Sequence, residues 1–176
     1  GEIVKPGALD ADILDKLEKN SDRLFDLSCM EDVTADCVRF KAGVVEKDEC
    51  ERNGLRKCLN MGHTTGHALE LFYGRRSHGE YVLIGMYFES IIAERKGVCS
   101  RVYAEQLRSL IQKVIGRIPK FRNIGEAARV ALFDKKNEGK NEVSLILPKT
   151  RGGFAEAKLS IGDYVGMIEE IGGGVL

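Results

Sequence analysis

The sequence lacks several features that would assign it to a special class of protein. It has no tryptophan, only three prolines and no excess of either charge, since Lys+Arg and Asp+Glu both number 27. It also lacks an apolar run of the roughly 20 residues that a membrane-spanning helix requires. The most apolar stretch, 81–93, is shorter and contains Glu89. The charge balance gives no reason to expect nucleic acid or a membrane surface as a partner.

The five cysteines form no C-x-x-C pair, and their number is odd. This pattern favours free thiols in a reducing compartment, so we predict a cytoplasmic protein. No signal peptide is visible at the start. Because the chain begins Gly-Glu-Ile-Val-Lys, without Met and without a capping or turn signal, we expect it to be a segment of a longer protein.

Helical periodicity dominates the remaining sequence, whose 176 residues are enough for one domain with a core. We predict that Pro6 and Gly7 end the first segment, and that Asp10 caps a helix reaching Asn20. Further helices are predicted over 22–27, 30–51, 60–73, 80–96, 102–114, 124–135 and 161–171. The helix over 80–96 is apolar on nearly all sides, which places it at the centre of a bundle.

Residues 142–147 and 154–159 read instead as a hairpin, with Gly152 and Gly153 in its loop. The sequence therefore predicts a single mainly α domain over residues 1–176, a helical bundle with one small β-hairpin. The glycine strings at 152–153 and 172–174 do not follow the dinucleotide-binding pattern. We expect no nucleotide site in this chain.

All three histidines lie within sixteen positions: His63, His67 and His78. His63 and His67 are four residues apart, so on a helix they share one face. Imidazole suits zinc, and a catalytic zinc site has three protein ligands, which leaves the third as a carboxylate or another histidine. Gly62 and Gly66 would each cost roughly 1 kcal/mol inside a helix, which suggests that a ligand or another backbone approaches closely there.

Basic residues gather around the histidines: Lys41, Arg56, Lys57 and, after Asp134, Lys135 and Lys136. They are either solvated surface or a pocket for phosphate or carboxylate, with Arg56 as a bidentate clamp. Asn60 lies about one helical turn before His63 and is placed to contact the same ligand. These residues together indicate a metal-dependent enzyme acting on a small anionic substrate.

The segment 54–70, GLRKCLNMGHTTGHALE, closely resembles the signature of the 3-dehydroquinate synthase family, GLR-x-x-LN-x-GHT-x-GHA-x-E. The residues His78-Gly79-Glu80 and Ile84-Gly85-Met86 continue the likeness. Shorter blocks follow in the family's order over the whole chain, at 2–5, 41–49, 134–136 and 145–148. Two departures are an extra residue between Asp48 and Arg56, and Thr65, where a bulkier apolar residue is common in the family.

The resemblance implies a metal- and NAD-dependent lyase of the shikimate pathway to aromatic amino acids. Such an enzyme converts 3-deoxy-arabino-heptulosonate 7-phosphate to 3-dehydroquinate and phosphate. The family's zinc ligands would fall on Glu2, His63 and His78, and His67 would face the substrate and transfer protons. The other positions that match substrate-contacting residues are Lys5, Lys41, Arg56, Asn60 and either Lys135 or Lys136.

The family's N-terminal NAD-binding domain has no counterpart in these residues, so we expect this chain alone to be inactive. The resemblance further implies a homodimer for the full-length enzyme. Two alternatives stay open. One is another NAD- and metal-dependent sugar phosphate cyclase, such as a 2-deoxy-scyllo-inosose synthase, whose substrate has no carboxylate. The other is a helical metal-binding module without catalysis.

Overall fold

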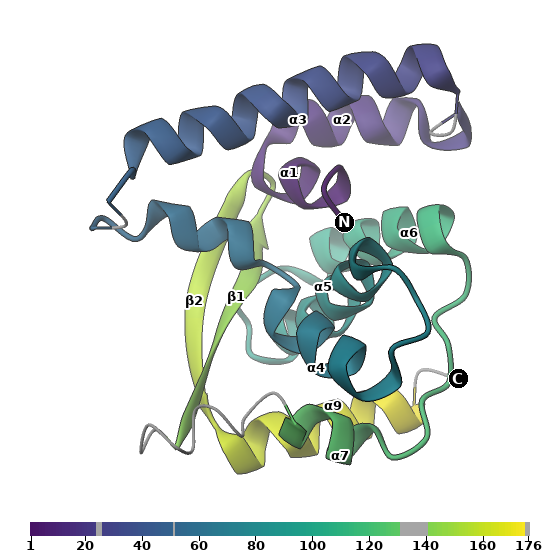
Figure 1. Cartoon of the computed structure of the whole chain (residues 1–176), viewed down its shortest axis with the longest axis vertical. Coiled ribbons are helices and arrows are strands. Elements are labelled where there is room, and N and C mark those ends of the chain that lie inside the picture. The colour runs from purple at the N-terminus through teal and green to yellow at the C-terminus, as the bar shows by residue number, and fades with distance from the viewer. Residues whose placement is uncertain (24–25, 51, 131–140, 175–176) are drawn as a thin grey trace.

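The chain folds as a helical bundle with one two-stranded hairpin, as the sequence predicts (Figure 1). A computed structural model describes residues 1–23, 26–50, 52–130 and 141–174. All five cysteines are free. None of the helices in these ranges is long and apolar enough to cross a bilayer.

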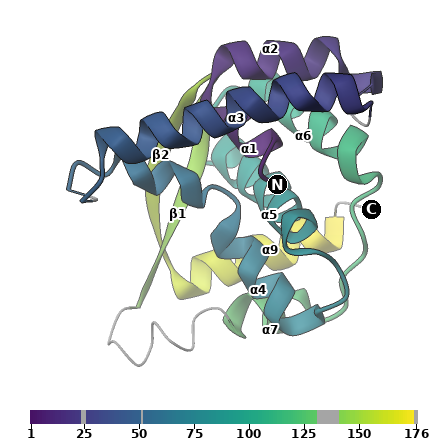
Figure 2. The same ribbon diagram turned by 45° about the horizontal axis from the view of Figure 1, so that its top comes forward.

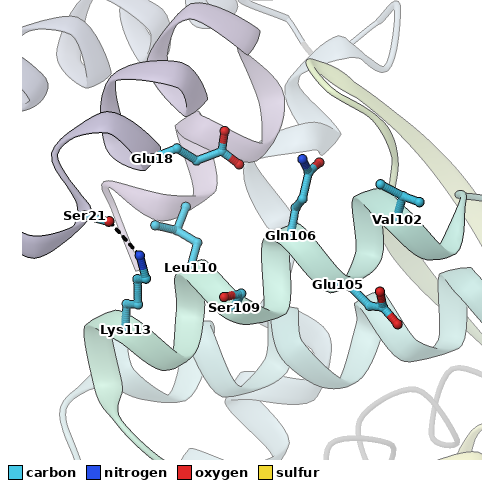
Figure 3. A pocket seen from close by; sticks show the side chains of 8 residues that line it. All are labelled: Glu18, Ser21, Val102, Glu105, Gln106, Ser109, Leu110 and Lys113. Atoms are coloured by element: carbon cyan, nitrogen blue, oxygen red, sulfur yellow. Dashed lines mark hydrogen bonds between the residues drawn. The ribbon is translucent and has the colours of Figure 1, made fainter.

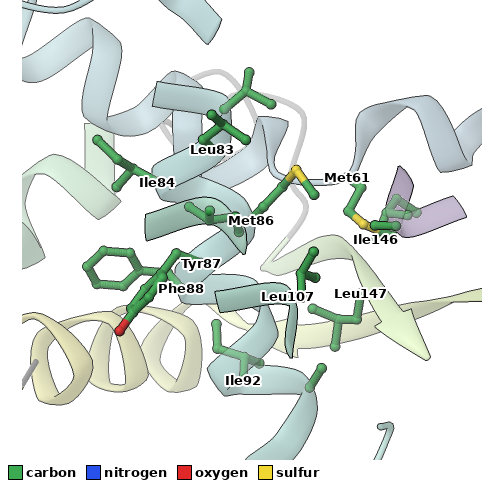
Figure 4. Packing of buried hydrophobic residues seen from close by; sticks show 14 of the residues in the cluster. Met61, Leu83, Ile84, Met86, Tyr87, Phe88, Ile92, Leu107, Ile146 and Leu147 are labelled. Atoms are coloured by element: carbon green, nitrogen blue, oxygen red, sulfur yellow. The ribbon is translucent and has the colours of Figure 1, made fainter. Parts of the chain in front are cut away.

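Helix α5 (His78–Arg95) forms the centre of the bundle, in agreement with its apolar sequence. It begins with a capping box in which Ser77 and Glu80 satisfy each other's backbone N–H groups. The elements that pack against it include α4 (His63–Tyr73), α6 (Arg101–Ile115), strand β1 (Glu142–Thr150) and α9 (Ile161–Gly174). Buried side chains of α5, among them Met86 and Phe88, lie in one hydrophobic cluster with Leu107 of α6 and Leu147, as Figure 4 shows.

The prediction that Pro6 and Gly7 end the first segment is wrong, because α1 (Val4–Leu9) contains both residues. Pro6 is the third residue of this helix and therefore lies in its first turn, where proline is tolerated. Helix α2 (Ala11–Lys19) follows with Asp10 as its predicted cap, since the Asp10 carboxylate accepts the N–H groups of Asp12 and Ile13.

A short 3₁₀ turn, η1 (Ser21–Arg23), leads towards α3 (Leu27–Lys47) in place of the separate helix predicted over 22–27. Helix α3 runs alongside α2, and both cross above α1 in Figures 1 and 2. The chain then turns at Gly54, whose φ of 77° favours glycine, and enters the 3₁₀ helix η2 (Leu55–Asn60).

The hairpin consists of β1 (Glu142–Thr150) and β2 (Gly153–Ser160), antiparallel with Glu142 opposite Ser160. Helix α7 (Ile124–Val130) packs on α4 and α9 (Ile161–Gly174), and the last of these closes the lower side of the bundle in Figure 1. The predicted substrate residues Lys135 and Lys136 lie outside the described residues, as does the end of the helix predicted over 124–135.

Candidate metal and substrate site

Three imidazoles converge at the meeting of α4 and α5. One ring nitrogen from each of His63, His67 and His78 lies within 4.8 Å of the others. The ring centroids of His63 and His67 are 5.2 Å apart, and that of His78 is 5.5 Å and 5.3 Å from them. His63 and His67 come from successive turns of α4, and His78 opens α5 after the loop at 74–77.

Glycines bring α4 and α5 close enough for this convergence. A Cβ at Gly85 would lie 2.1 Å from the Gly62 carbonyl oxygen, and one at Gly66 would lie 2.8 Å from that of Tyr81. These distances are far below van der Waals contact, so neither position accepts a side chain while the helices stay in place. The glycines at 62 and 66 predicted close approach of a ligand or another backbone, and the approaching group is the backbone of α5. Gly62 itself caps α4 with φ 77° and is not inside the helix.

Hydrogen bonds leave the Nε2 atoms of two histidines available to a ligand. The Nδ1 of His63 lies 3.2 Å from the carbonyl oxygen of Met61, a partner that can only accept, so Nδ1 carries the proton. The Nδ1 of His78 lies 2.8 Å from a carboxylate oxygen of Glu70. A histidine that donates from Nδ1 to a carbonyl or carboxylate is oriented for metal binding through Nε2.

Burial also favours the neutral form of His63. Loss of solvent, followed by the positive charge of Lys5, lowers the pKa of His63 to about 4. Its imidazole is therefore unprotonated near neutral pH, as a metal ligand must be. The donor set fits a divalent ion that accepts imidazole nitrogen, and zinc, cobalt or a similar metal would satisfy it.

Glu2, the third ligand implied by the family resemblance, is held by two lysines. Its carboxylate accepts hydrogen bonds from Lys5 at 3.1 Å and from Lys41 at 3.2 Å. Burial opposes ionisation, but these bonds and charges outweigh it and lower the pKa of Glu2 to about 2. Lys5 is itself almost completely buried, and desolvation lowers its pKa although Glu2 opposes the shift.

The N-terminal segment reaches the histidines through its backbone. A Cβ added at Gly1 would lie 3.0 Å from the carbonyl oxygen of Gly79, so the residues next to Glu2 and His78 touch. The charge of Lys5 also acts on His63. The structure thus brings Lys5 to the histidine cluster. The Glu2 carboxylate is turned to Lys5 and Lys41, and the group of ligand atoms that lie within 4.8 Å of one another comprises His63, His67 and His78 without it.

Asp48 organises the loop that carries Arg56. One oxygen of its buried carboxylate accepts the backbone N–H of Arg56 at 2.9 Å, and the other accepts that of Asn53 at 3.2 Å. These backbone bonds outweigh desolvation and keep the pKa of Asp48 below its usual value. The Arg56 guanidinium donates to the Glu49 carbonyl oxygen at 3.4 Å. Asn60 lies exposed at the end of η2, three residues before His63.

Three residues of this region were not assigned a role from the sequence: Asp48, Glu70 and Glu89. Glu70 is the last residue of the histidine signature, and Asp48 lies within the family-like segment 41–49. Both positions could therefore have been predicted to matter from the sequence. Glu89 was noticed as the charged residue of an apolar run, and a charge at such a position indicates a buried partner.

A separate hollow lies between the end of α2 and α6, apart from the histidines. Its volume is about 420 Å³, and its lining combines polar side chains with Val102 and Leu110 (Figure 3). Lys113 donates to the Ser21 hydroxyl across one end at 2.7 Å. The lining holds no histidine or cysteine, so it offers no comparable ligand set for a transition metal.

Comparison with known proteins supports the family resemblance seen in the sequence. A family model described as 3-dehydroquinate synthase C-terminal matches residues 1–137. The curated 3-dehydroquinate synthase of Alkaliphilus metalliredigens (strain QYMF) is 34% identical over 173 residues, which cover 91% of this chain and 46% of that protein. That of Pelobacter propionicus is 39% identical over 142 residues, 77% of this chain and 39% of that protein. The chain spans less than half the length of these relatives.

Solved structures show the same fold. A 2-epi-5-epi-valiolone synthase from Streptomyces hygroscopicus subsp. jinggangensis 5008, with NAD⁺ and Zn²⁺ bound, superposes with a TM-score of 0.78 at 18% identity. The match covers 97% of this chain and 49% of that one. A 2-deoxy-scyllo-inosose synthase complexed with carbaglucose-6-phosphate, NAD⁺ and Co²⁺ gives a TM-score of 0.66 at 25% identity, over 80% of this chain and 40% of that one.

Proposed function

Since the chain belongs to the 3-dehydroquinate synthase C-terminal family, we propose that it is the metal- and substrate-binding half of a 3-dehydroquinate synthase. The proposed reaction converts 3-deoxy-arabino-heptulosonate 7-phosphate to 3-dehydroquinate and phosphate. The observation that carries the proposal is the convergence of three imidazoles, with the charge of Lys5 acting on one of them, His63. NAD would be bound mainly by a domain outside these residues, which the greater length of the relatives can accommodate.

We propose Glu2, His63 and His78 as ligands of a divalent metal, with zinc as the first candidate. A bound divalent cation supplies Lewis acidity at a substrate hydroxyl. His67 then remains for the substrate. Its exposed imidazole lies beside the other two and can transfer a proton to or from the substrate.

Lysines and Arg56 would bind the carboxylate and phosphate of the substrate. In the structure the ammonium groups of Lys5 and Lys41 both pair with the single carboxylate of Glu2. A Glu2 carboxylate that turned to a metal ion would release both ammonium groups for an anionic substrate. Metal and substrate would therefore bind cooperatively, because one movement of Glu2 prepares both sites.

The assignment of Glu2 and His67 can be tested by metal binding to the purified 176-residue chain. We expect one Zn²⁺ per chain in the wild type, a large loss of affinity in Glu2→Ala and a smaller effect in His67→Ala. The reverse order, with Glu2→Ala unchanged and His67→Ala deficient, would replace Glu2 by His67 as the third ligand. An absence of zinc binding in the wild type would contradict the proposed function.

Turnover should require the remainder of the enzyme. We expect the purified chain, supplied with Zn²⁺, NAD⁺ and the heptulosonate phosphate, to form no dehydroquinate, because the proposed reaction begins with hydride transfer to NAD. A steady-state assay for dehydroquinate checks this, and measurable turnover would contradict it. We also propose that the complete enzyme is a homodimer.

A second candidate is a 2-deoxy-scyllo-inosose synthase, since one such enzyme shares the fold at 25% identity. The two substrates differ in charge, because glucose 6-phosphate has no carboxylate. Titration of the zinc-loaded chain with each ligand distinguishes the candidates. We expect the heptulosonate phosphate to bind more tightly, with the difference lost in the Lys5→Gln and Lys41→Gln variants.

A further inference from the structure

Glu89 is a carboxylate without solvent exposure in the middle of the central helix α5. One of its oxygens accepts the backbone N–H of Gly62 at 2.7 Å, and the other accepts that of Thr65 at 3.3 Å. The donors are the cap and the third residue of α4, so a side chain of one helix binds the start of another.

These bonds replace a cap that α4 cannot supply for itself. The cap residue of a helix ordinarily provides an oxygen for the N–H three residues on, and a glutamate there returns a bond to the cap's own N–H. Gly62 has no side chain, and its φ of 77° excludes most others. A Cβ at Gly62 would also lie 2.4 Å from the Met86 side chain. Glu89 therefore accepts both capping N–H groups from outside the helix.

A third element secures this arrangement. The hydroxyl of Tyr164, a fully buried residue of α9, donates to the Thr65 hydroxyl oxygen at 3.2 Å. The start of α4 is thus tied to α5 through Glu89 and to α9 through Tyr164. His63 lies directly between the two amides that Glu89 binds, and His67 follows one turn later.

We propose that Glu89 is a positioning residue that fixes the first turn of α4, so that His63 and His67 face His78. The inference rests on the proposed function, in which these histidines serve metal and substrate. Glu89 does not touch the ligands; it acts through the backbone on both sides of His63.

Metal affinity tests this role separately from fold stability. In Glu89→Gln an amide nitrogen replaces one oxygen and faces a backbone N–H, so one of the two bonds to the backbone of α4 is lost. We expect the affinity for Co²⁺ to fall on the order of tenfold, with an altered visible spectrum of the bound ion. Ser90→Ala is the matched control, because the buried Ser90 hydroxyl donates only to Tyr87 of its own helix. Wild-type affinity and spectrum in a folded Glu89→Gln protein would overturn the proposal.

Imidazole ¹H–¹⁵N spectra of the metal-free protein test whether Glu89 positions His63. We expect His63 to carry its proton on Nδ1 in the wild type and in Ser90→Ala, and a mixture of tautomers in Glu89→Gln. If the wild-type protein binds no metal, the proposed function fails, but the His63 spectra still show whether Glu89 positions the His63 ring. Identical His63 spectra in the three proteins would contradict it.

If Glu89→Gln fails to fold, amide exchange in the wild type gives the answer. Linkage requires that a cap which favours metal binding is in turn strengthened by the metal. Zinc should therefore slow exchange of the Gly62 and Thr65 amides more than that of Ser90. Equal effects at the three amides would overturn the proposal.

Discussion

At the scale of single residues, the hydrogen bond from His78 to Glu70 sets which ring nitrogen is available to a ligand. Removing the acceptor in Glu70→Ala should lower zinc affinity about 10- to 100-fold, because the imidazole loses its fixed tautomer and orientation. Glu70→Gln keeps one oxygen acceptor and should lose less. Competition with a chelating dye measures both. Equal affinities of Glu70→Ala and wild type would contradict this role of Glu70.

Glu89 should also give the protein an unusual dependence of stability on pH. Burial outweighs the bonds from Gly62 and Thr65 and raises the pKa of Glu89 to about 7, from 4.5 for a free side chain. Between these values the folded state binds more protons than the unfolded state, so the free energy of unfolding falls as pH rises. The full difference across this window is roughly 3 kcal/mol.

The comparison with Glu89→Gln isolates this contribution. The Gly1 amino group, whose pKa burial lowers from 8.0 to about 6, acts in the opposite direction as pH rises from 6 to 8. Both proteins carry the Gly1 amino group, so its contribution cancels when their unfolding by urea is compared at pH 5 and pH 8. We expect wild type to lose more stability than Glu89→Gln over this range. Parallel curves would show that Glu89 does not titrate in the window.

Single residues also mark what a sequence can reveal. The histidine cluster was predictable because His63 and His67 are one helical turn apart and His78 follows after a short loop. The partners of Glu89 were not, because its bonds reach residues 24 and 27 positions away and end on backbone atoms. No pattern of side chains specifies such a contact, whereas a charge within an apolar run indicates only that one exists.

At the scale of elements, the contact between α4 and α5 depends on the absence of a side chain at Gly85. Gly85→Ala would place its Cβ 2.1 Å from a backbone oxygen of Gly62, which cannot move without shifting the histidines. We expect a loss of about 2 kcal/mol or more in unfolding free energy, since the clash outweighs the helix propensity of alanine.

Gly43→Ala is the matched control for this prediction. Gly43 also lies inside a helix, α3, but a Cβ there meets no atom within 4 Å. It should stabilise the protein by roughly 0.5–1 kcal/mol through helix propensity. Urea unfolding of both variants measures the contrast. A Gly85→Ala protein as stable as Gly43→Ala would show that the helices separate without cost.

The same elements show where local rules succeed. Asp10 caps α2 as predicted, and the helices predicted to end at 73, 96 and 114 end within one residue of those positions. A glycine with positive φ follows each of these three ends, at Gly74, Gly97 and Gly116. The prediction of a break at Pro6 failed, because a proline interrupts a helix in its interior but is tolerated in its first turn. The sequence of α1 does not specify which of the two applies. Burial of α1 against α2, α3 and α6 decides it.

At the scale of the whole molecule, the candidate site joins parts of the chain that are distant in sequence. Glu2 lies just before α1, Lys41 lies on α3 and the histidines lie on α4 and α5. The start of α1 meets the start of α5 at Gly1 and Gly79. A metal bound by Glu2, His63 and His78 would therefore tie the N-terminal segment to the core of the bundle.

This tie predicts that zinc stabilises the N-terminal segment more than any other part of the chain. At a free zinc concentration 100 times the dissociation constant, unfolding should cost about 2.7 kcal/mol more than in the metal-free protein. Glu2→Ala should reduce the gain at the same zinc concentration, whereas Glu31→Ala, which removes an exposed carboxylate from α3, should keep it. Urea unfolding with zinc or chelator measures the gain, and amide exchange of residues 4–9 locates it. An equal gain in Glu2→Ala, without protection of residues 4–9, would mean that the metal is held by α4 and α5 alone.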